Sequence, residues 1–435
     1  MDESYNTLFE EAVESADVQT SVPEGLADGN GKIYKMVLQA ESDQGLDAIS
    51  YNEIEHRPFV RGKLPWSKAE ENRAWEPADD SHFRAYMQQK YSARGKSDLA
   101  DAFMIVANGR RYDPLVEMIE KLPEWDGVKR VDTLAIDFIG AEDTPYSRAC
   151  MRLAMNGAMM RAFYPGCKFD TMLVFEGVQG GRKSSFARAL ALDDDFFTDN
   201  IGNIGKKEAS ECIQGKWIVE VGELASFRKS EVEQVKLFVS QQADNYRVPY
   251  EKYASPKKRR CIFIGTTNSK SFLADATGAR RFLPVHCDPE KITMDVFSDG
   301  THDYMEQAWA EIYQEFKEER KLSLILPEEV RAAAMEAQQG YSAVDVNTGT
   351  ILNYIETFVR PGERICILQI MDKVFEIERE EASQPKHKAF QNEIAAILDN
   401  KIPNLVRLKG RPKHSDYYGQ QTCWVYQPDT QGGAL

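Results

Sequence analysis

An eight-residue segment, Gly177-Val178-Gln179-Gly180-Gly181-Arg182-Lys183-Ser184, carries the residue types that bind polyphosphate. It follows an apolar run, residues 172–175, and precedes a helical pattern that begins at Ser185. A glycine-rich turn between a strand and a helix directs backbone N–H groups and the positive helix end at phosphates, and the lysine reaches the terminal phosphates. The residues expected to contact a nucleotide are Gly177, Gln179, Gly180, Gly181, Arg182, Lys183, Ser184 and Ser185.

The segment departs from the usual loop at one position, because Arg182 stands where a second glycine is expected before the lysine. Glycine at that place lets the backbone approach phosphate without a Cβ atom in the way. An arginine keeps its N–H but must direct its side chain outward or onto the phosphates. The alternative interpretation is a glycine-rich turn with one solvated lysine.

Two acidic residues follow a second apolar run, and one amide residue follows a third. Glu220 and Glu223 lie at the end of the run that starts at Trp217, and Asn268 follows the run 261–265. The carboxyl ends of parallel strands are where α/β proteins bind ligands. We expect Glu220, with Ser184, to bind Mg²⁺, Glu223 to activate water, and Asn268 to contact the γ-phosphate. The alternative is a pair of solvated acids and an ordinary turn.

Basic residues are concentrated in three later segments. Arg280 and Arg281 precede a fourth apolar run, and one of them is a candidate arginine finger for a neighbouring subunit; the alternative is a surface ion pair. Between the second and third runs lies basic sequence interleaved with tyrosine, which suits single-stranded nucleic acid, although a basic surface loop remains an alternative. Its candidate DNA-binding residues are Arg247, Tyr250, Lys252, Lys257 and Lys258.

The elements that position these residues alternate between short apolar runs and helical patterns beyond residue 166, which predicts an α/β domain with a mostly parallel sheet. We expect this P-loop domain over residues 145–325, preceded by a helical domain over residues 31–144. Residues 1–30 carry eight acids and no Lys or Arg, so they account for more than half of the net charge of −15. They predict an acidic disordered tail.

The last segment, residues 326–435, predicts three helices, at residues 350–358, 367–374 and 388–399, and then two strands. This order suggests a winged helix. Its hairpin carries Arg407, Lys409 and Arg411, which are further candidate DNA contacts, and a solvated basic loop is the alternative. The longest apolar stretch contains arginines and falls short of the roughly 20 residues that a membrane span needs. With no signal segment and seven scattered cysteines, we expect a cytoplasmic protein with reduced thiols.

The motifs between Phe175 and Val285 together resemble the virulence-associated protein E (VapE) family of phage and mobile-element replication proteins, which is related to superfamily 3 helicases of the AAA+ class. The matching stretches are Glu176–Gly180 with Lys183-Ser184, Gly215–Glu220 with Glu223-Leu224, Asp244–Tyr250, Gly265–Asn268 and Thr277-Gly278 with Arg280-Arg281-Phe282. Upstream, Trp125-Asp126-Gly127 with Arg130 and Pro165–Lys168 are also similar.

The resemblance implies an ATP hydrolase that works as a homo-hexameric ring and moves along single- or double-stranded DNA as a helicase in DNA replication. ATP would lie between Lys183 of one subunit and an arginine of the next, and the basic segment between the second and third strands would grip DNA in the pore. The chain lacks room for the priming domain that some relatives carry in front, so any priming would come from a primase or other replication protein in trans. The alternatives are a nucleotide-switched DNA-binding initiation or regulatory protein with little turnover, and a P-loop kinase for a small substrate.

Overall fold

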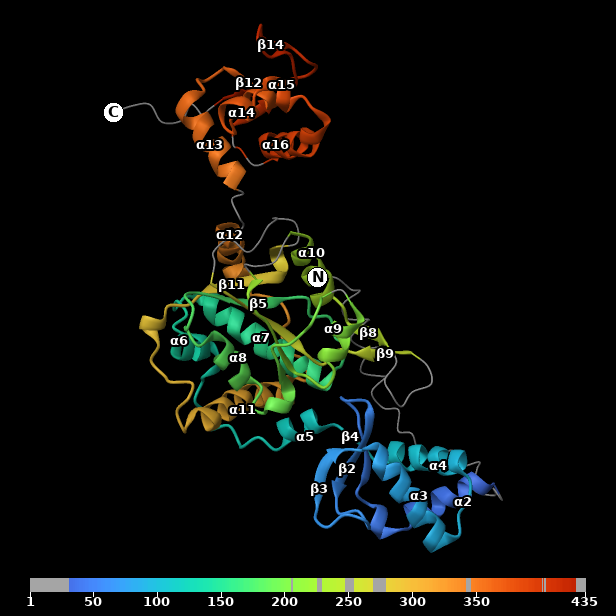
Figure 1. Ribbon diagram of the computed structural model, residues 1–435. Helices are drawn as coiled ribbons and strands as arrows, with labels where there is room; N and C mark the ends of the chain where they lie inside the picture. The colour runs from blue at the N-terminus through green and yellow to red at the C-terminus, as the bar shows by residue number, and fades with distance from the viewer. Residues whose placement is uncertain are drawn as a thin grey trace. The chain divides into compact units, whose positions relative to one another are not determined.

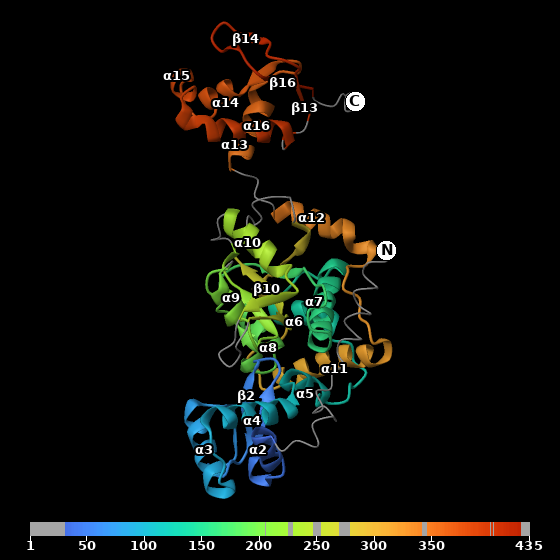
Figure 2. The same ribbon diagram turned by 90° about the vertical axis from the view of Figure 1, so that its right-hand side faces the viewer.

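The computed structural model describes residues 31–204, 206–224, 229–246, 254–268, 279–341, 346–400, 402 and 404–427. The predicted acidic tail, residues 1–30, therefore lies outside the described part. The chain divides into two compact units, Met1–Tyr341 and Ser342–Leu435. Figure 1 and Figure 2 show the first unit as a small mixed α/β domain followed by a larger domain built around a parallel sheet.

The N-terminal domain is not wholly helical as expected, because it contains a four-stranded sheet with the order β3-β2-β1-β4. The elements are α2 (Lys32–Glu41), η3 (Gln44–Leu46), β1 (Ile49–Asn52), β2 (Arg57–Gly62), β3 (Glu71–Ala74), α3 (Pro77–Tyr91), α4 (Lys96–Gly109) and β4 (Arg111–Tyr112). Pro58, which resembles loop punctuation in the sequence, lies within β2 opposite Tyr51. The helices cover the sheet and bury aromatic residues such as Trp75 and Phe103, whose ring centroids are 4.4 Å apart.

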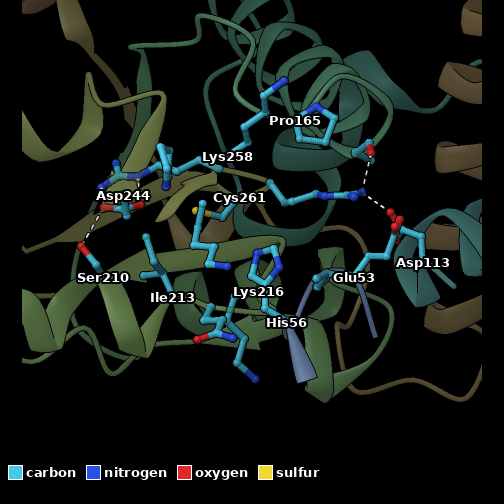
Figure 3. A pocket seen from close by; sticks show the side chains of 18 of the residues that line it. Glu53, His56, Asp113, Pro165, Ser210, Ile213, Lys216, Asp244, Lys258 and Cys261 are labelled. Atoms are coloured by element: carbon cyan, nitrogen blue, oxygen red, sulfur yellow. Dashed lines mark hydrogen bonds and ion pairs between the residues drawn. The ribbon is translucent and has the colours of Figure 1, made fainter. Parts of the chain in front are cut away.

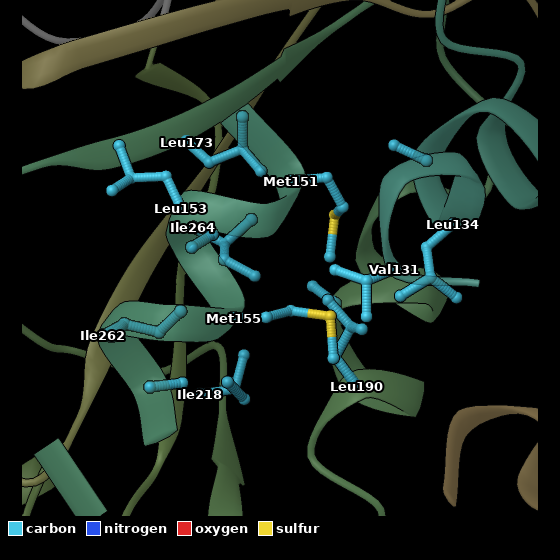
Figure 4. Packing of buried hydrophobic residues seen from close by; sticks show 14 of the residues in the cluster. Val131, Leu134, Met151, Leu153, Met155, Leu173, Leu190, Ile218, Ile262 and Ile264 are labelled. Carbon is cyan, nitrogen blue, oxygen red and sulfur yellow. The ribbon is translucent and has the colours of Figure 1, made fainter. Parts of the chain in front are cut away.

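The helices between residues 113 and 163 contribute to the core of the P-loop domain, although the sequence assigned most of them to the N-terminal domain. They are α5 (Pro114–Glu120), η4 (Val131–Thr133), α6 (Leu134–Ile139) and α7 (Pro145–Phe163). Figure 4 shows Met151 and Met155 of α7 packed between Val131 and Leu134 on one side and the strands on the other. Since α7 is buried on nearly all sides, its sequence carries little amphipathic pattern.

The P-loop domain has a five-stranded parallel sheet with the order β11-β5-β10-β7-β6. Its strands are β5 (Met172–Glu176), β6 (Phe197–Thr198), β7 (Ile218–Val221), β10 (Ile262–Thr267) and β11 (Phe282–His286). Four of them were predicted from their apolar runs, and the two-residue β6 was not. The strands are buried on both faces, as parallel sheets flanked by helices require.

Alternate residues of these strands belong to two separate hydrophobic clusters, one on each face of the sheet. Leu173 and Ile264 face α7, α8 and α11, whereas Val174 and Phe263 face α9 and α10. The remaining elements of the domain are η5 (Asp194–Phe196), α8 (Lys183–Leu190), α9 (Lys207–Cys212), α10 (Lys229–Val239), η7 (Ala279–Arg281), η8 (Pro289–Lys291), α11 (Thr301–Glu319), η9 (Glu328–Val330) and α12 (Arg331–Tyr341). The domain therefore has three layers, helix, sheet and helix.

An antiparallel hairpin precedes β10 and consists of β8 (Ala243–Tyr246) and β9 (Ser255–Lys258). A buried ion pair fixes its base, because Arg259 Nε lies 2.6 Å from Asp244 Oδ2 and both side chains are at most 5% exposed. Arg259 also stacks over the ring of Phe238, which connects the hairpin to α10. The hairpin therefore has a rigid base at the amino end of β10.

The second unit has its own hydrophobic core and contains the three predicted helices. Its elements are α13 (Val346–Phe358), β12 (Arg364–Cys366), α14 (Ile367–Lys373), α15 (Arg379–Ala382), η10 (Pro385–His387), α16 (Lys388–Asn400), β13 (Leu405–Arg407), β14 (Lys413–Ser415), β15 (Gly419–Gln420) and β16 (Cys423–Tyr426). Strands β12, β16 and β13 form one sheet in that order, and β14 and β15 form a hairpin between β13 and β16. Within the described ranges, no helix is long and apolar enough to cross a membrane.

Candidate phosphate-binding site

The glycine-rich loop connects the carboxyl end of β5 to the amino end of α8, as the sequence predicts. Gly177 is buried, and a Cβ atom there would clash with the carbonyl oxygen of Cys287. Gly180 has a φ of 83°, in the region that favours glycine. Gln179 is exposed at the turn of the loop. The backbone therefore needs glycine at both places, one for close packing and one for its dihedral angle.

Arg182 adopts the left-handed conformation, with φ 58° and ψ 15°, although it carries a Cβ atom. Its guanidinium donates a hydrogen bond to Asp295 Oδ1 and lies 5.5 Å from the ring centroid of Phe297. Both partners belong to the segment that precedes α11. The backbone conformation therefore suits the glycine usually found here, and the arginine side chain is directed onto the protein.

Lys183 is the first residue of α8 and is 9% exposed. Its Nζ donates hydrogen bonds of 2.9 Å to the carbonyl oxygens of Gly177 and Val178. Burial lowers the pKa of the Lys183 ammonium, and the nearby acidic side chains only partly oppose this effect. An anion placed in the loop would compensate the buried charge, which is what a phosphate provides.

Glu220 lies near the end of β7 and is 2% exposed. One carboxylate oxygen, Oε1, accepts hydrogen bonds of 2.6 Å from both Ser184 Oγ and Thr266 Oγ1. The other oxygen, Oε2, is buried and has no hydrogen-bond partner among the described residues. Since a buried carboxylate oxygen without a partner is costly, it suits a cation or its water ligand. The side chains of Ser184 and Glu220 therefore fit the predicted Mg²⁺ site.

Three neighbouring strands thus end at this edge of the sheet, and Thr266 is a residue of the site that was not predicted. Thr266 is buried and contacts Glu220, whereas the sequence favoured Asn268, which is exposed just after β10. Glu223 is also exposed and has a φ of 51°. The sequence shows only that polar residues follow the third apolar run. The parallel pairing of β10 with β7 is what selects Thr266, since it places that strand beside Glu220.

A second carboxylate lies at the same edge. Glu176, the last residue of β5, is 4% exposed, and its Oε2 lies 2.7 Å from Nδ1 of His286, the last residue of β11. The pair joins the carboxyl end of β11 to the carboxyl end of β5, where the glycine-rich loop begins. Neither residue was predicted to belong to the site.

The two candidate finger arginines lie at the other edge of the sheet. Arg281 precedes β11, and its Nε donates a 2.7 Å hydrogen bond to Ser240 Oγ and lies 3.8 Å from Asp170 Oδ2. Arg280 is exposed beside it. Because the strands are parallel, residues that precede β11 lie at the edge opposite the loop after β5. The structure therefore does not bring either arginine to Lys183 of the same chain.

The predicted DNA contacts are only partly described. Arg247, Tyr250 and Lys252 lie outside the described residues, whereas Lys257 is buried and Lys258 is exposed, both in β9. In the second unit, Arg407 lies in β13 and pairs with Asp399 at 2.8 Å. Lys409 and Arg411 are exposed in the connection between β13 and β14.

Comparison with known proteins identifies one family. The family model of the virulence-associated protein E-like domain matches residues 119–343, just over half of the chain, and this confirms the resemblance found in the motifs. Two solved apo structures of the NrS-1 C terminal region are similar over 91% of this chain and 98% of theirs, with identities of 11% and 14% and TM-scores of 0.45 and 0.42. No curated protein matches the sequence.

Proposed function

We propose that this chain, which belongs to the virulence-associated protein E-like domain family, binds and hydrolyses ATP and uses it to move along or unwind DNA in phage-type or mobile-element replication. The observation that supports this most directly is the arrangement at Glu220. Its carboxylate contacts the loop residue Ser184 and the strand residue Thr266, and it keeps one buried oxygen for a cation. A purely structural turn has no need of such a residue.

The proposed roles follow from the contacts of each side chain. Lys183 exchanges its bonds to Gly177 and Val178 for bonds to the β- and γ-phosphates, so its buried charge gains a partner. Ser184 and Glu220 hold Mg²⁺, which neutralises charge on the phosphate oxygens when it is bound. Two exposed residues have the remaining roles. Glu223, which follows β7, activates the attacking water, and Asn268, which follows β10, contacts the γ-phosphate.

A homo-hexameric ring is proposed because neither candidate finger arginine lies at the phosphate site of its own chain. Arg280 and Arg281 lie at the opposite sheet edge, so either can act only on the nucleotide of a neighbouring subunit. Such an arginine contributes roughly 10³-fold or more to phosphoryl transfer. The β8–β9 hairpin and the second unit, proposed as a winged helix, would contact single- or double-stranded DNA, and a primase would act as a separate partner.

One observation favours a second candidate function. Arg182 holds the loop to Asp295, and a loop tied in this way suits a DNA-binding replication or regulatory protein that binds nucleotide as a switch with little turnover. The two functions differ in whether DNA stimulates hydrolysis.

The test is ATP hydrolysis by the purified full chain, with and without single-stranded DNA, beside Lys183→Ala. Arg188→Ala serves as the matched control, because Arg188 lies on the same helix but is exposed and paired with Asp194. We expect DNA to stimulate the wild type and the control, and Lys183→Ala to be inactive while its circular dichroism is unchanged. Hydrolysis by Lys183→Ala at the wild-type rate would refute the site, and nucleotide binding without turnover in the wild type would favour the switch.

A further inference from the structure

A cavity of about 630 Å³ lies at the sheet edge opposite the phosphate-binding loop. Its wall includes Lys216 and Cys261, which come just before β7 and β10, and the base of the β8–β9 hairpin. The amino ends of two central strands therefore border it. None of the predicted nucleotide-binding residues lines this cavity.

The N-terminal domain supplies another wall of the same cavity. Figure 3 shows Glu53 and His56, from the turn between β1 and β2, and Lys216 and Lys258, from the P-loop domain, around one space. The turn is held in place, because Ile54 is 3% exposed and packs in the core of the P-loop domain. The amide of Gln214 also donates a hydrogen bond to the carbonyl oxygen of Glu55. The two domains therefore form this cavity by a specific contact.

The lining is positively charged in a chain whose net charge is −15. It contains six Lys or Arg and three Asp or Glu, a surplus of three positive charges. Each acid is paired with an arginine: Asp244 with Arg259, Asp113 with Arg260, and Glu53 with Arg111. A cavity with this lining attracts a polyanion.

We propose that this cavity binds the backbone phosphates of a single strand of DNA at the base of the β8–β9 hairpin, with Arg111 and Lys216 as phosphate contacts. The proposal rests on the DNA-directed function proposed above and names a surface for it. Its volume lies in the range of roughly 300–1,000 Å³ that holds small ligands, so it accommodates a nucleotide or two of a strand and excludes a duplex. The rings of Tyr164 and His56 in the lining offer surfaces for a base.

The N-terminal domain thereby becomes part of the DNA path. Arg111, in β4, is the cation of that domain in the lining, and its guanidinium lies 5.0 Å from the ring centroid of Tyr51. Lys216 lines the cavity from the loop before β7. Its Nζ donates a 2.8 Å hydrogen bond to the carbonyl oxygen of Asp195, which lies outside the lining, and would exchange this bond for one to a phosphate. Neither residue belongs to the hairpin, so their loss separates the cavity from the hairpin itself.

The experiment measures binding of labelled oligo(dT) to the full-length double variant Arg111→Gln/Lys216→Gln by fluorescence anisotropy over a range of salt concentrations. Loss of two phosphate contacts should weaken binding about tenfold near physiological salt and reduce the slope of log K against log salt by about 1.4. The control variant Lys129→Gln/Lys317→Gln removes the same charge from exposed lysines outside the cavity and should bind like the wild type. The single variant Arg111→Lys keeps the charge, so its affinity for oligo(dT) should stay close to that of the wild type.

Binding of a fluorescent ATP analogue to the same proteins separates this proposal from the proposed ATPase. We expect it to be unchanged in Arg111→Gln/Lys216→Gln, which also shows that the variant is folded. Wild-type DNA affinity and salt slope in that variant would overturn the cavity proposal and leave the ATPase intact. Hydrolysis without any DNA binding in the wild type would overturn the cavity and the DNA-directed function together. The last outcome concerns Lys183→Ala. If this variant still binds the ATP analogue, and adding Arg111→Gln/Lys216→Gln to it abolishes that binding, the cavity is a mononucleotide site and the proposal fails.

Discussion

Replacement of Arg182 by glycine and by alanine should separate the backbone of the phosphate-binding loop from its side-chain contact. Arg182 holds a left-handed conformation that costs a residue with a Cβ atom about 1.5 kcal/mol. Its side chain repays part of this through the ion pair with Asp295 and the contact with the Phe297 ring. Both contacts are partly exposed, so each contributes about 0.5 kcal/mol.

The two substitutions differ in which of these contributions they remove. Arg182→Ala loses both contacts and keeps the backbone strain, so it should destabilise the P-loop domain by about 1 kcal/mol. Arg182→Gly loses the same contacts and adds about 0.5 kcal/mol of unfolded-state entropy, but it removes the strain of about 1.5 kcal/mol. Its stability should therefore equal that of the wild type. For a domain of this size the alanine variant should melt about 2–4 °C lower.

Differential scanning calorimetry measures the effect, and addition of an ATP analogue identifies the transition of the P-loop domain, because a ligand of the folded state raises its melting temperature. ATP turnover is measured on the same variants. Since the backbone already has the conformation that glycine favours, Arg182→Gly should hydrolyse ATP at close to the wild-type rate. Equal melting temperatures for the glycine and alanine variants would refute the strain argument. A large gain in turnover for Arg182→Gly would support the switch function, because the tie to Asp295 would then restrain hydrolysis.

Three further predictions concern other parts of the P-loop domain. Thr266→Val removes one of the two donors to Glu220 and should lower ATP turnover roughly tenfold, the equivalent of about 1.4 kcal/mol, with binding of a fluorescent ATP analogue retained; equal turnover would contradict the role of Thr266. Because burial lowers the pKa of Lys183, and its charged form binds phosphate, affinity for the ATP analogue should fall as the pH is raised into the alkaline range, and should fall less in Lys183→Arg. Asp244→Ala leaves Arg259 buried without its carboxylate, so thermal unfolding should show a loss of about 3–5 kcal/mol, and a smaller loss than that of an exposed pair would contradict the structural role.

The central strands could be predicted from the sequence because each is buried on both faces and reads as an unbroken apolar run. The N-terminal sheet could not be predicted in this way. Its strand β1 is buried but contains Ser50 and Asn52, and β2 includes Pro58. Residues 49–52 alternate between apolar and polar types, but only over four positions, and a proline within a run argues against a strand. The buried Ser50 Oγ is satisfied by the neighbouring strand, through its hydrogen bond to the Phe59 carbonyl oxygen, and this pairing appears only in the fold.

The candidate site shows the same division between local and distant information. Gly177, Lys183 and Ser184 lie within one eight-residue segment, so the sequence alone predicts that they form a single loop. The contact of Thr266 with Glu220 depends on strand order, and the contact of Arg182 with Asp295 joins residues 113 positions apart. No periodicity or spacing in the sequence contains either contact. Composition also gave no sign of the cavity, because its cations come from three separate segments.

The two ends of β7 and β10 connect the site to the cavity. Lys216 comes just before β7, which carries Glu220, and Cys261 comes just before β10, which carries Thr266. Each strand spans about 13–20 Å at 3.3 Å per residue and is buried on both faces, so it transmits a displacement with little deformation. Glu220 and Thr266 therefore lie on the same two rigid strands whose amino ends border the cavity, so the two proposed sites are joined within one domain.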